Sequence, residues 1–286
     1  MPLYSENELF VFSSDPVEPE HEIVEDLTTP SNTTQIPFPE ISFDGRLEFI
    51  TNSLEYSLRD GQVRALQGLY EGRDILLVAR TGYGKTLIMT GFDRLFEAGG
   101  IILILSPLKA IEDCQARESR IVWGNGIRPF VLNGESNSLQ SRRDIALGMY
   151  THIWLSPEFA VGDLDEEPAG DDSTRGMAKK PKKMAARKAI TVLDGFRDNG
   201  TFSGVLQHPE FQRRLRLVAI DELHLCAKNG WGDFRPHFSQ LHILRAQLPD
   251  TVPLFGTTAT LTKINEAEIR ASAGFGPDSL VLRTVK

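Results

Sequence analysis

Five short apolar runs, set between helix-like and polar stretches, constrain the fold of this 286-residue chain most strongly. Nearly continuous Val, Ile and Leu are typical of parallel strands that helices cover on both faces, because neither face of such a strand meets water. We therefore expect an α/β domain whose mostly parallel, doubly wound sheet forms the middle of three layers. The runs are DILLVA (74–79), GIILILSP (100–107), HIWLSP (152–157), LRLVAID (215–221) and PLFGTTA (253–259).

The composition agrees with a globular domain, since hydrophobic residues make up 41% of the chain and charged residues 24%. No apolar run approaches the roughly 20 residues that a membrane-spanning helix needs. The N-terminus also lacks the basic start and long apolar stretch of a secretory signal. We expect an intracellular protein without a transmembrane segment. Its two cysteines, Cys114 and Cys226, lie far apart in the sequence, which favours reduced, buried thiols over a disulfide or a zinc site.

The charge is distributed unevenly along the chain. Residues 1–45 contain ten Asp or Glu and no Lys or Arg, and without them the net charge of −8 becomes +2. This acidic, proline-punctuated composition predicts a disordered tail. A second irregular stretch, at about 163–195, is first acidic and then basic, and it indicates a charged insertion. Its KKPKK core at 179–183 is compatible with a nuclear localisation signal, a nucleic-acid contact or a solvated loop.

Ligands of doubly wound sheets bind beyond the carboxyl ends of the strands, and the first candidate motif stands at such an end. A strand predicted over 75–78 is followed by the loop ARTGYGKT (79–86) and by a helix predicted from Leu87. Glycines let backbone N–H groups turn toward phosphate oxygens, while Lys85 supplies a cation for the terminal phosphates and Thr86 can bind Mg²⁺. The pattern predicts a nucleotide phosphate-binding loop; the alternative is a glycine-rich turn with a chance lysine. The predicted nucleotide-binding residues of the loop are Thr81, Gly82, Tyr83, Gly84, Lys85 and Thr86.

Two adjacent carboxylates follow the fourth apolar run, in LRLVAIDELHLC (215–226). Asp221 can hold the Mg²⁺ that bridges the terminal phosphates, and Glu222 can orient and deprotonate the attacking water. A capping or surface pair is the alternative for two acidic residues at a strand end. Together with the loop at 79–86, the pair predicts an ATPase site.

The string Asp221-Glu222-Leu223-His224 resembles the DExH box of superfamily-two helicases, and further motifs of that family then follow in order. The segment 58–62, LRDGQ, is similar to the adenine-recognising element of RecQ-type helicases. The resemblance implies that Gln62 reads the base edge and that Arg59 supports it, while a polar patch at a helix start is the alternative. It also implies a catalytic set of Lys85, Asp221, Glu222 and His224.

Three more short strings extend the resemblance. Ser106-Pro107-Leu108-Lys109, with Asp113 and Gln115 beyond it, resembles the SPL motif. Ser156-Pro157-Glu158 resembles the TPE motif, and both motifs face the bound nucleic-acid strand in the family. The resemblance therefore implies nucleic-acid contacts for Ser106, Pro107, Lys109 and Ser156. Thr258-Ala259-Thr260 resembles the motif that links hydrolysis to domain movement, so Thr258, Ala259 and Thr260 are the implied coupling residues.

The stretch WGDFRP (231–236) is similar to the aromatic-rich loop of RecQ helicases. Trp231 and Phe234 can stack on unpaired bases, and Arg235 can lie near phosphates. Burial of both rings in the core is the alternative. The stretch departs from the family pattern because six residues separate His224 from Trp231, where the family has four, and because the expected histidine between Gly232 and Asp233 is missing.

The resemblance covers about residues 48–286 and implies a RecA-like P-loop NTPase fold, with the first of two motor domains at 46–286. A second RecA-like domain is expected to be absent from this chain. The implied activity is ATP-dependent 3′ to 5′ DNA unwinding in the nucleus, in DNA repair and recombination, with ATP and Mg²⁺ as cofactors. Single-stranded or forked DNA is the implied partner, with a second RecA-like domain supplied in trans. The alternatives are a non-catalytic nucleotide- or DNA-binding module and a DEAH-type RNA helicase.

Overall fold

The computed structural model describes residues 24–25, 42–96, 100–107, 109–161, 191–193, 196–227 and 236–284. Most of the predicted acidic tail and of the predicted insertion lies outside these residues. At both places the described structure reaches into the predicted irregular segment: a helix begins at Phe43 with Ser42 as its N-cap, and residues 191–193 form a strand. None of the helices in the described ranges has the length and apolarity that crossing a bilayer requires.

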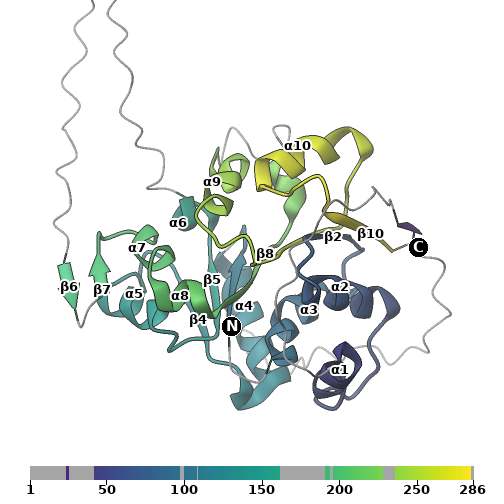
Figure 1. Ribbon diagram of the computed structural model, residues 1–286, viewed down its shortest axis with the longest axis horizontal. Coiled ribbons are helices and arrows are strands. Elements are labelled where there is room, and N and C mark those ends of the chain that lie inside the picture. Colours follow the sequence, from purple (N-terminus) through teal and green to yellow (C-terminus); the bar gives the residue numbers. More distant parts are fainter. Residues whose placement is uncertain are drawn as a thin grey trace, which may run out of the picture.

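An eight-stranded sheet forms the centre of the molecule, in the order β1-β10-β2-β9-β8-β3-β5-β4 (Figure 1). Each neighbouring pair is parallel except β1 with β10, which is antiparallel. A separate antiparallel pair is formed by β6 and β7. The strands are β1 Val24–Glu25, β2 Ile75–Val78, β3 Ile101–Leu105, β4 Pro129–Leu132, β5 His152–Leu155, β6 Thr191–Leu193, β7 Phe196–Asp198, β8 Leu215–Ile220, β9 Leu254–Thr258 and β10 Leu280–Arg283.

Helices cover both faces of this sheet. The α-helices are α1 Phe43–Thr51, α2 Asp60–Tyr70, α3 Lys85–Gly91, α4 Lys109–Trp123, α5 Leu139–Ala146, α6 Pro157–Val161, α7 Ser203–Leu206, α8 Pro209–Arg214, α9 Leu241–Arg245 and α10 Lys263–Ala273. Short 3₁₀ turns are η1 Phe92–Leu95, η2 Gly124–Gly126, η3 Leu223–Cys226 and η4 Pro236–Gln240. Figure 1 shows α9 and α10 on one side of the sheet and α1, α2 and α3 on the other.

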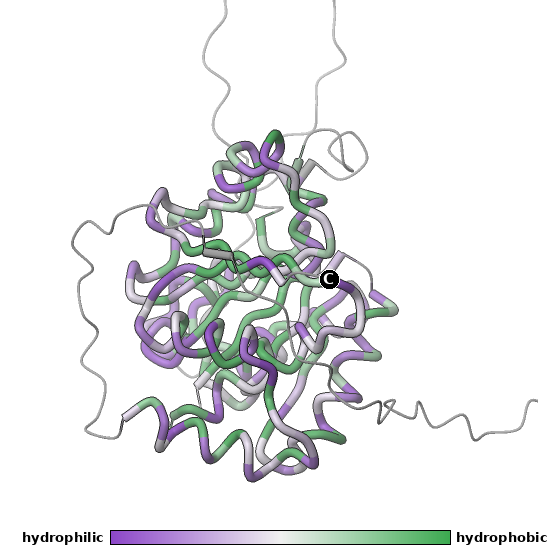
Figure 2. The backbone as a smooth tube through the Cα atoms, turned by 90° about the vertical axis from the view of Figure 1, so that its right-hand side faces the viewer, coloured by the Kyte–Doolittle hydropathy of each residue, from purple (hydrophilic) through white to green (hydrophobic). Residues whose placement is uncertain are grey.

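Two hydrophobic cores explain the three layers. Along β3, Leu103 belongs to one core, whereas its neighbours Ile102 and Ile104 belong to the other, because successive strand side chains point to opposite faces. Helices α1 to α4 pack on the core of Ile102, and α5 to α10 contribute to the core of Leu103. Figure 2 shows the same arrangement as hydrophobic stretches inside the molecule with hydrophilic ones toward its outside.

All five predicted strands are present, and the predicted α/β class is confirmed. The prediction missed the short strands β1, β6 and β7, and also β4, which begins with Pro129, and β10, which ends with Arg283. The prediction of a buried thiol is right for Cys226 and wrong for Cys114, which is exposed. Helix α4 buries positions 112, 115, 116, 119 and 123, and position 114 lies on its other face.

Candidate functional site

The phosphate-loop candidate connects the carboxyl end of β2 to α3. The helix begins at Lys85, two residues earlier than predicted, and Gly84 precedes it in the left-handed conformation with φ of 87°. Gly82 has a φ of 80°. A side chain at Gly84 would place its Cβ 2.5 Å from Gln62 Nε2. Both the backbone twist and the close approach therefore require glycine at this position.

Lys85 folds back over this loop. Its Nζ donates to the carbonyl oxygens of Ala79, at 3.1 Å, and Arg80, at 3.2 Å. The ammonium group is thus held among backbone carbonyls at the start of the loop. Phosphate oxygens are stronger acceptors for a cation than neutral carbonyls, so an incoming phosphate can take over these hydrogen bonds.

The adenine-element candidate packs directly against the loop. Gln62 is buried, and its Nε2 donates to the carbonyl oxygens of Tyr83, at 3.1 Å, and Gly84, at 3.3 Å. Its Oε1 accepts from the backbone N–H of Arg59 at 2.9 Å. The Arg59 guanidinium lies 5.1 Å from the centre of the Tyr83 ring. The structure therefore joins the segments 58–62 and 79–86 into one unit.

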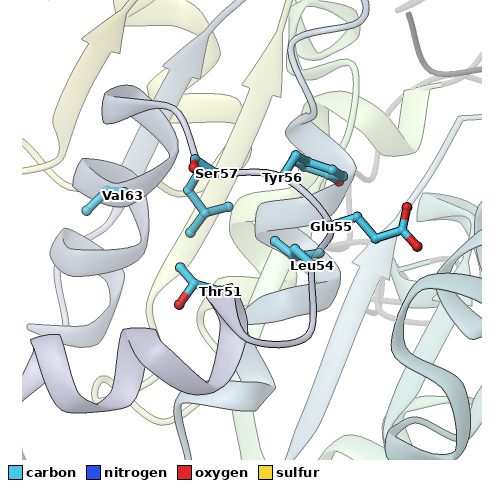
Figure 3. A pocket seen from close by; sticks show the side chains of 7 residues that line it. Thr51, Leu54, Glu55, Tyr56, Ser57 and Val63 are labelled. Carbon is cyan, nitrogen blue, oxygen red and sulfur yellow. The ribbon is translucent and has the colours of Figure 1, made fainter. Parts of the chain in front are cut away.

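A pocket of about 400 Å³ opens beside this unit, between the end of α1 and the start of α2 (Figure 3). Sequence reasoning missed it, although an aromatic residue three positions before Arg59 is a usable signal. Tyr56 lines the pocket with 49% of its surface exposed, so its ring remains available for stacking. The pocket is lined by Thr51, Leu54, Glu55, Tyr56, Ser57, Leu58 and Val63.

The first carboxylate, Asp221, follows β8 and is 7% exposed. Its backbone N–H donates to the carbonyl of Leu105 at 2.9 Å, which continues the sheet by one residue. Its Oδ1 accepts from Thr257 Oγ1 at 2.9 Å and from the backbone N–H of Glu222 at 3.0 Å. Its Oδ2 accepts from Gln115 Nε2 at 3.0 Å. The carboxylate is therefore held in one orientation at the sheet edge.

The second carboxylate, Glu222, has a left-handed backbone, with φ of 51° and ψ of 48°. It is the one non-glycine residue with positive φ in the described part of the chain, and such strain is most often found at functional sites. Its carboxylate lies 3.2 Å from His224 Nδ1. The hydrogen bond from His224 is the largest cause of a lowered Glu222 pKa, and the charge of Lys85 contributes as well. Glu222 is therefore an anion at neutral pH, within electrostatic reach of the phosphate loop.

The coupling-motif residues lie between these two parts. β9 runs between β2 and β8, and the carbonyl of Thr258 accepts from the N–H of Ala79 at 3.0 Å. Thr258 Oγ1 lies 3.1 Å from His224 Nδ1 and 3.2 Å from the N–H of Thr260, from which it accepts. Ala259 and Thr260 are exposed just beyond the strand. A change at this strand end would therefore reach both His224 and the phosphate loop.

The residues predicted to face nucleic acid have mixed positions. The Ser106 side chain is fully buried, and its hydroxyl has no hydrogen-bond partner within the described ranges, so it is not a surface contact in this structure. Pro107 is also buried. Lys109 is exposed and pairs with Glu135 at 2.8 Å, while the carbonyl of Ser156 accepts from the N–H groups of Phe159 and Ala160 in α6. Trp231, Phe234 and Arg235 lie outside the described residues.

In a comparison with known protein families, residues 59–158 match the DEAD/DEAH box helicase family. ATP-dependent DNA helicase Q-like 2 of Arabidopsis thaliana is 27% identical over 206 residues, which cover 72% of this chain and 24% of that protein. ATP-dependent DNA helicase RecQ of Haemophilus influenzae is 26% identical over 218 residues, covering 74% of this chain and 27% of that protein. The mouse bifunctional 3′-5′ exonuclease/ATP-dependent helicase WRN is 28% identical over 193 residues, covering 67% and 10%. The chain thus spans between about a tenth and about a quarter of these relatives.

Solved helicase structures have the same fold. The DUF1998 helicase MrfA bound to DNA and AMPPNP superposes with a TM-score of 0.56 at 18% identity, covering 94% of this chain and 32% of that one. The Mycobacterium smegmatis helicase Lhr bound to single-stranded DNA and AMP-PNP superposes with a TM-score of 0.53 at 20% identity, covering 83% and 27%. The resemblance to DExH helicases of the RecQ type and the RecA-like fold, both expected from the sequence, are confirmed.

Proposed function

We propose that this chain provides the ATP-binding motor domain of a RecQ-like, ATP-dependent DNA helicase. One observation carries the proposal: Lys85 at the start of α3, just after β2, and Asp221 and Glu222 after β8 flank the same strand, β9, at the carboxyl edge of the sheet. The charge of Lys85 contributes to the lowered pKa of Glu222, so the two parts lie within electrostatic reach of each other.

The nucleotide binds along this edge. Its phosphates replace the carbonyl oxygens of Ala79 and Arg80 as acceptors for Lys85 Nζ. The base takes the pocket beside α2, where the half-exposed ring of Tyr56 offers a stacking surface and Gln62 and Arg59 lie at the helix start. Gln62 then exchanges part of its present hydrogen bonding to the loop for the base edge. Base recognition and loop conformation are thereby linked through one side chain.

Magnesium fits the oxygen donors that the chain offers here, the Thr86 hydroxyl and the Asp221 carboxylate, because a hard cation at a phosphate site takes its other ligands from water and phosphate. When bound, Mg²⁺ neutralises charge on the terminal phosphates. Asp221 Oδ2 accepts one hydrogen bond and retains capacity for a further partner. Glu222 accepts a proton from the attacking water, and the contact with His224 keeps it ionised until then.

DNA is the proposed second ligand. Single-stranded or forked DNA passes the edge that carries Lys109, and the aromatic composition of the sequence 231–236 suits stacking on unpaired bases. We propose that strand separation, with 3′ to 5′ polarity, requires a second RecA-like domain from elsewhere in the protein or in trans. The solved helicases MrfA and Lhr are in complexes with DNA, which supports this choice of ligand.

Steady-state ATP hydrolysis by the purified chain, with and without single-stranded DNA, tests the proposal. Lys85→Ala is expected to lower turnover about a hundredfold or more, because it removes the cation that stabilises charge on the transferred phosphoryl group. Lys263→Ala, at the exposed start of α10, is the matched control for loss of a lysine and should leave turnover unchanged.

Two outcomes would redirect the proposal. Lys85-dependent nucleotide binding without turnover, even with DNA and a second domain present, would favour a non-catalytic binding module. Stimulation by RNA strands rather than DNA strands would favour an RNA helicase.

A further inference from the structure

We propose that Gln115 is a positioning residue for Asp221, and that the indole of Trp154 locks Gln115 in the single amide orientation that serves this role. The inference rests on the function proposed above, since it concerns the carboxylate that would hold Mg²⁺. Gln115 lies on α4, Trp154 on β5 and Asp221 at the end of β8.

The three side chains form a continuous hydrogen-bonded chain. Trp154 Nε1 donates to Gln115 Oε1 at 3.1 Å, and Gln115 Nε2 donates to Asp221 Oδ2 at 3.0 Å. Trp154 is fully buried, Gln115 is 8% exposed and Asp221 is 7% exposed. Water has little access to any of these groups, so each depends on its protein partner for hydrogen bonding.

The chemistry of the partners determines the amide orientation. An indole N–H can only donate and an ionised carboxylate can only accept, so Gln115 must direct its oxygen toward Trp154 and its NH₂ group toward Asp221. The opposite orientation would put the amide oxygen against a carboxylate oxygen and the NH₂ group against the indole N–H. Trp154 therefore excludes the flipped form of Gln115, although it does not contact Asp221 itself.

Gln115 has a special position among the donors to Asp221. Thr257 Oγ1 and the Glu222 N–H both bind Oδ1, whereas within the described part of the chain Gln115 is the one donor to Oδ2. An ionised carboxylate has about four lone-pair directions, so Oδ2 is the oxygen with capacity left for another ligand. Gln115 therefore sets the direction of the carboxylate oxygen that keeps capacity for a metal ligand.

The location of Gln115 gives this contact a further consequence. Helix α4 begins at Lys109, the exposed last residue of the segment 106–109 that resembles a strand-facing helicase motif. A displacement of this helix start by a bound strand would move Gln115 relative to β8. The contact between Gln115 and Asp221 is thus a physical link from the start of α4 to the carboxylate.

Magnesium dependence of nucleotide binding tests the inference without requiring turnover. The probe is a fluorescent N-methylanthraniloyl derivative of ATP, titrated with the full chain at fixed Mg²⁺ concentrations and in EDTA. Gln115→Met keeps the side-chain length and removes both hydrogen bonds. We expect the Mg²⁺ concentration for half-maximal enhancement of binding to rise about tenfold, as for other residues that orient metal ligands. Binding in EDTA should stay within about twofold, because the base and phosphate contacts do not involve Gln115.

Trp154→Phe tests the orientation while Gln115 is unchanged. It should raise the same Mg²⁺ concentration about threefold, since the freed amide then samples both orientations. The double variant should match Gln115→Met alone, because Trp154 acts through Gln115. Ser119→Ala is the matched control: Ser119 is buried on the same helix and donates to the Gln115 backbone carbonyl at 2.6 Å, so it reports loss of a buried hydrogen bond away from Asp221.

The binding measurements distinguish a failure of the proposed function from a failure of the role inferred for Gln115. Wild-type binding that is insensitive to Lys85→Ala would overturn the proposed function, and this inference with it. Lys85-dependent binding whose Mg²⁺ requirement is the same in wild type, Gln115→Met and Trp154→Phe would overturn this inference alone. If Gln115→Met does not fold, Trp154→Phe provides the test. A shifted Mg²⁺ requirement supports the positioning of Asp221 by Trp154 through Gln115, and an unchanged requirement refutes it.

Discussion

The amino edge of the sheet, where its parallel strands begin, and the carboxyl edge, where they end, both contain buried polar groups. The two edges use these groups in opposite ways. At the amino edge, His152 opens β5 and is fully buried, with Nε2 lying 3.0 Å from the carbonyl of Thr90 and Nδ1 lying 3.0 Å from Thr151 Oγ1. Trp123 Nε1 donates to Thr90 Oγ1 at 2.9 Å. At the carboxyl edge, Lys85 and Glu222 are partly exposed and Asp221 keeps an oxygen with spare capacity.

The electrostatics of the two edges differ in the same direction. Burial lowers the pKa of His152 to about 4 and raises the pKa of Asp93, in η1, to about 6, so the amino edge favours the neutral forms of its titratable groups. At the carboxyl edge, His224 and Lys85 lower the pKa of Glu222 and so favour its charged form. Neutral and internally satisfied groups stabilise the fold, whereas charged and accessible groups are available for chemistry.

The largest expected effect comes from Glu222→Gln at the carboxyl edge. The amide cannot take a proton from water, so ATP turnover should fall about 10²- to 10⁴-fold, while nucleotide affinity and the midpoint of thermal unfolding change little. Single-turnover kinetics, together with fluorescence titration of the nucleotide, separates the two quantities. Equal losses of nucleotide affinity and ATP turnover would contradict the role given to Glu222. They would also contradict the assignment of chemistry to the carboxyl edge and of fold stability to the amino edge.

Opposite pH slopes should appear when the amino edge is altered one residue at a time. The pKa of His152 is lowered in the folded state, so the contribution of this residue to stability is present above pH 6.5 and is lost as the pH falls toward about 4. The pKa of Asp93 is raised in the folded state. Its contribution to stability is therefore present below the unfolded-state pKa near 3.8 and is lost as the pH rises through about 6. The two slopes oppose each other in the wild type.

Urea unfolding between pH 4 and 6.5 measures these slopes. Asp93→Asn should leave the slope of His152, with stability falling in acid, and His152→Gln should leave the slope of Asp93, with stability rising in acid. Each change is on the order of 2 kcal/mol across this window. Parallel slopes in the two variants would show that other groups control the pH dependence.

The smallest expected effect is at Thr90, whose hydroxyl accepts from Trp123 Nε1 and donates to the carbonyl of Thr86 at 2.9 Å. Thr90→Val leaves the buried indole N–H without a partner and should lower the free energy of unfolding by about 1–2 kcal/mol. Adding Trp123→Phe should recover part of this loss, because both polar partners are then gone. Chemical denaturation of the two single variants and the double variant tests the cycle. Strictly additive losses would mean that the hydrogen bond contributes little.

Sequence reasoning predicted the parts of the fold that depend on local pattern. The inner strands are continuous apolar runs because both of their faces are covered, so burial on two sides leaves a direct trace in composition. β4 forms one edge of the sheet and begins with Pro129, and β10 lies between β2 and the two-residue β1 and ends with Arg283, so the apolar signal of both strands is weaker. Cys114 was misassigned because the burial of a helical residue depends on which face packs, and this is set by neighbours far away in the sequence.

For the candidate site, whether a feature could be predicted from the sequence depends on how far apart its residues lie along the chain. Gly84, Lys85 and Thr86 act within one turn of backbone, so their residue types and spacing already specify a phosphate loop. The hydrogen bonds of Gln62 to Tyr83 and of Gln115 to Asp221 span 21 and 106 positions, and no local pattern records them. Parallel strands bring their carboxyl ends to one edge, and close packing then allows a single orientation of each buried polar side chain. The residue types therefore follow from the sequence, whereas the oxygen of Asp221 that remains available and the groups that hold it follow from the packing of α4 and β5 against β8.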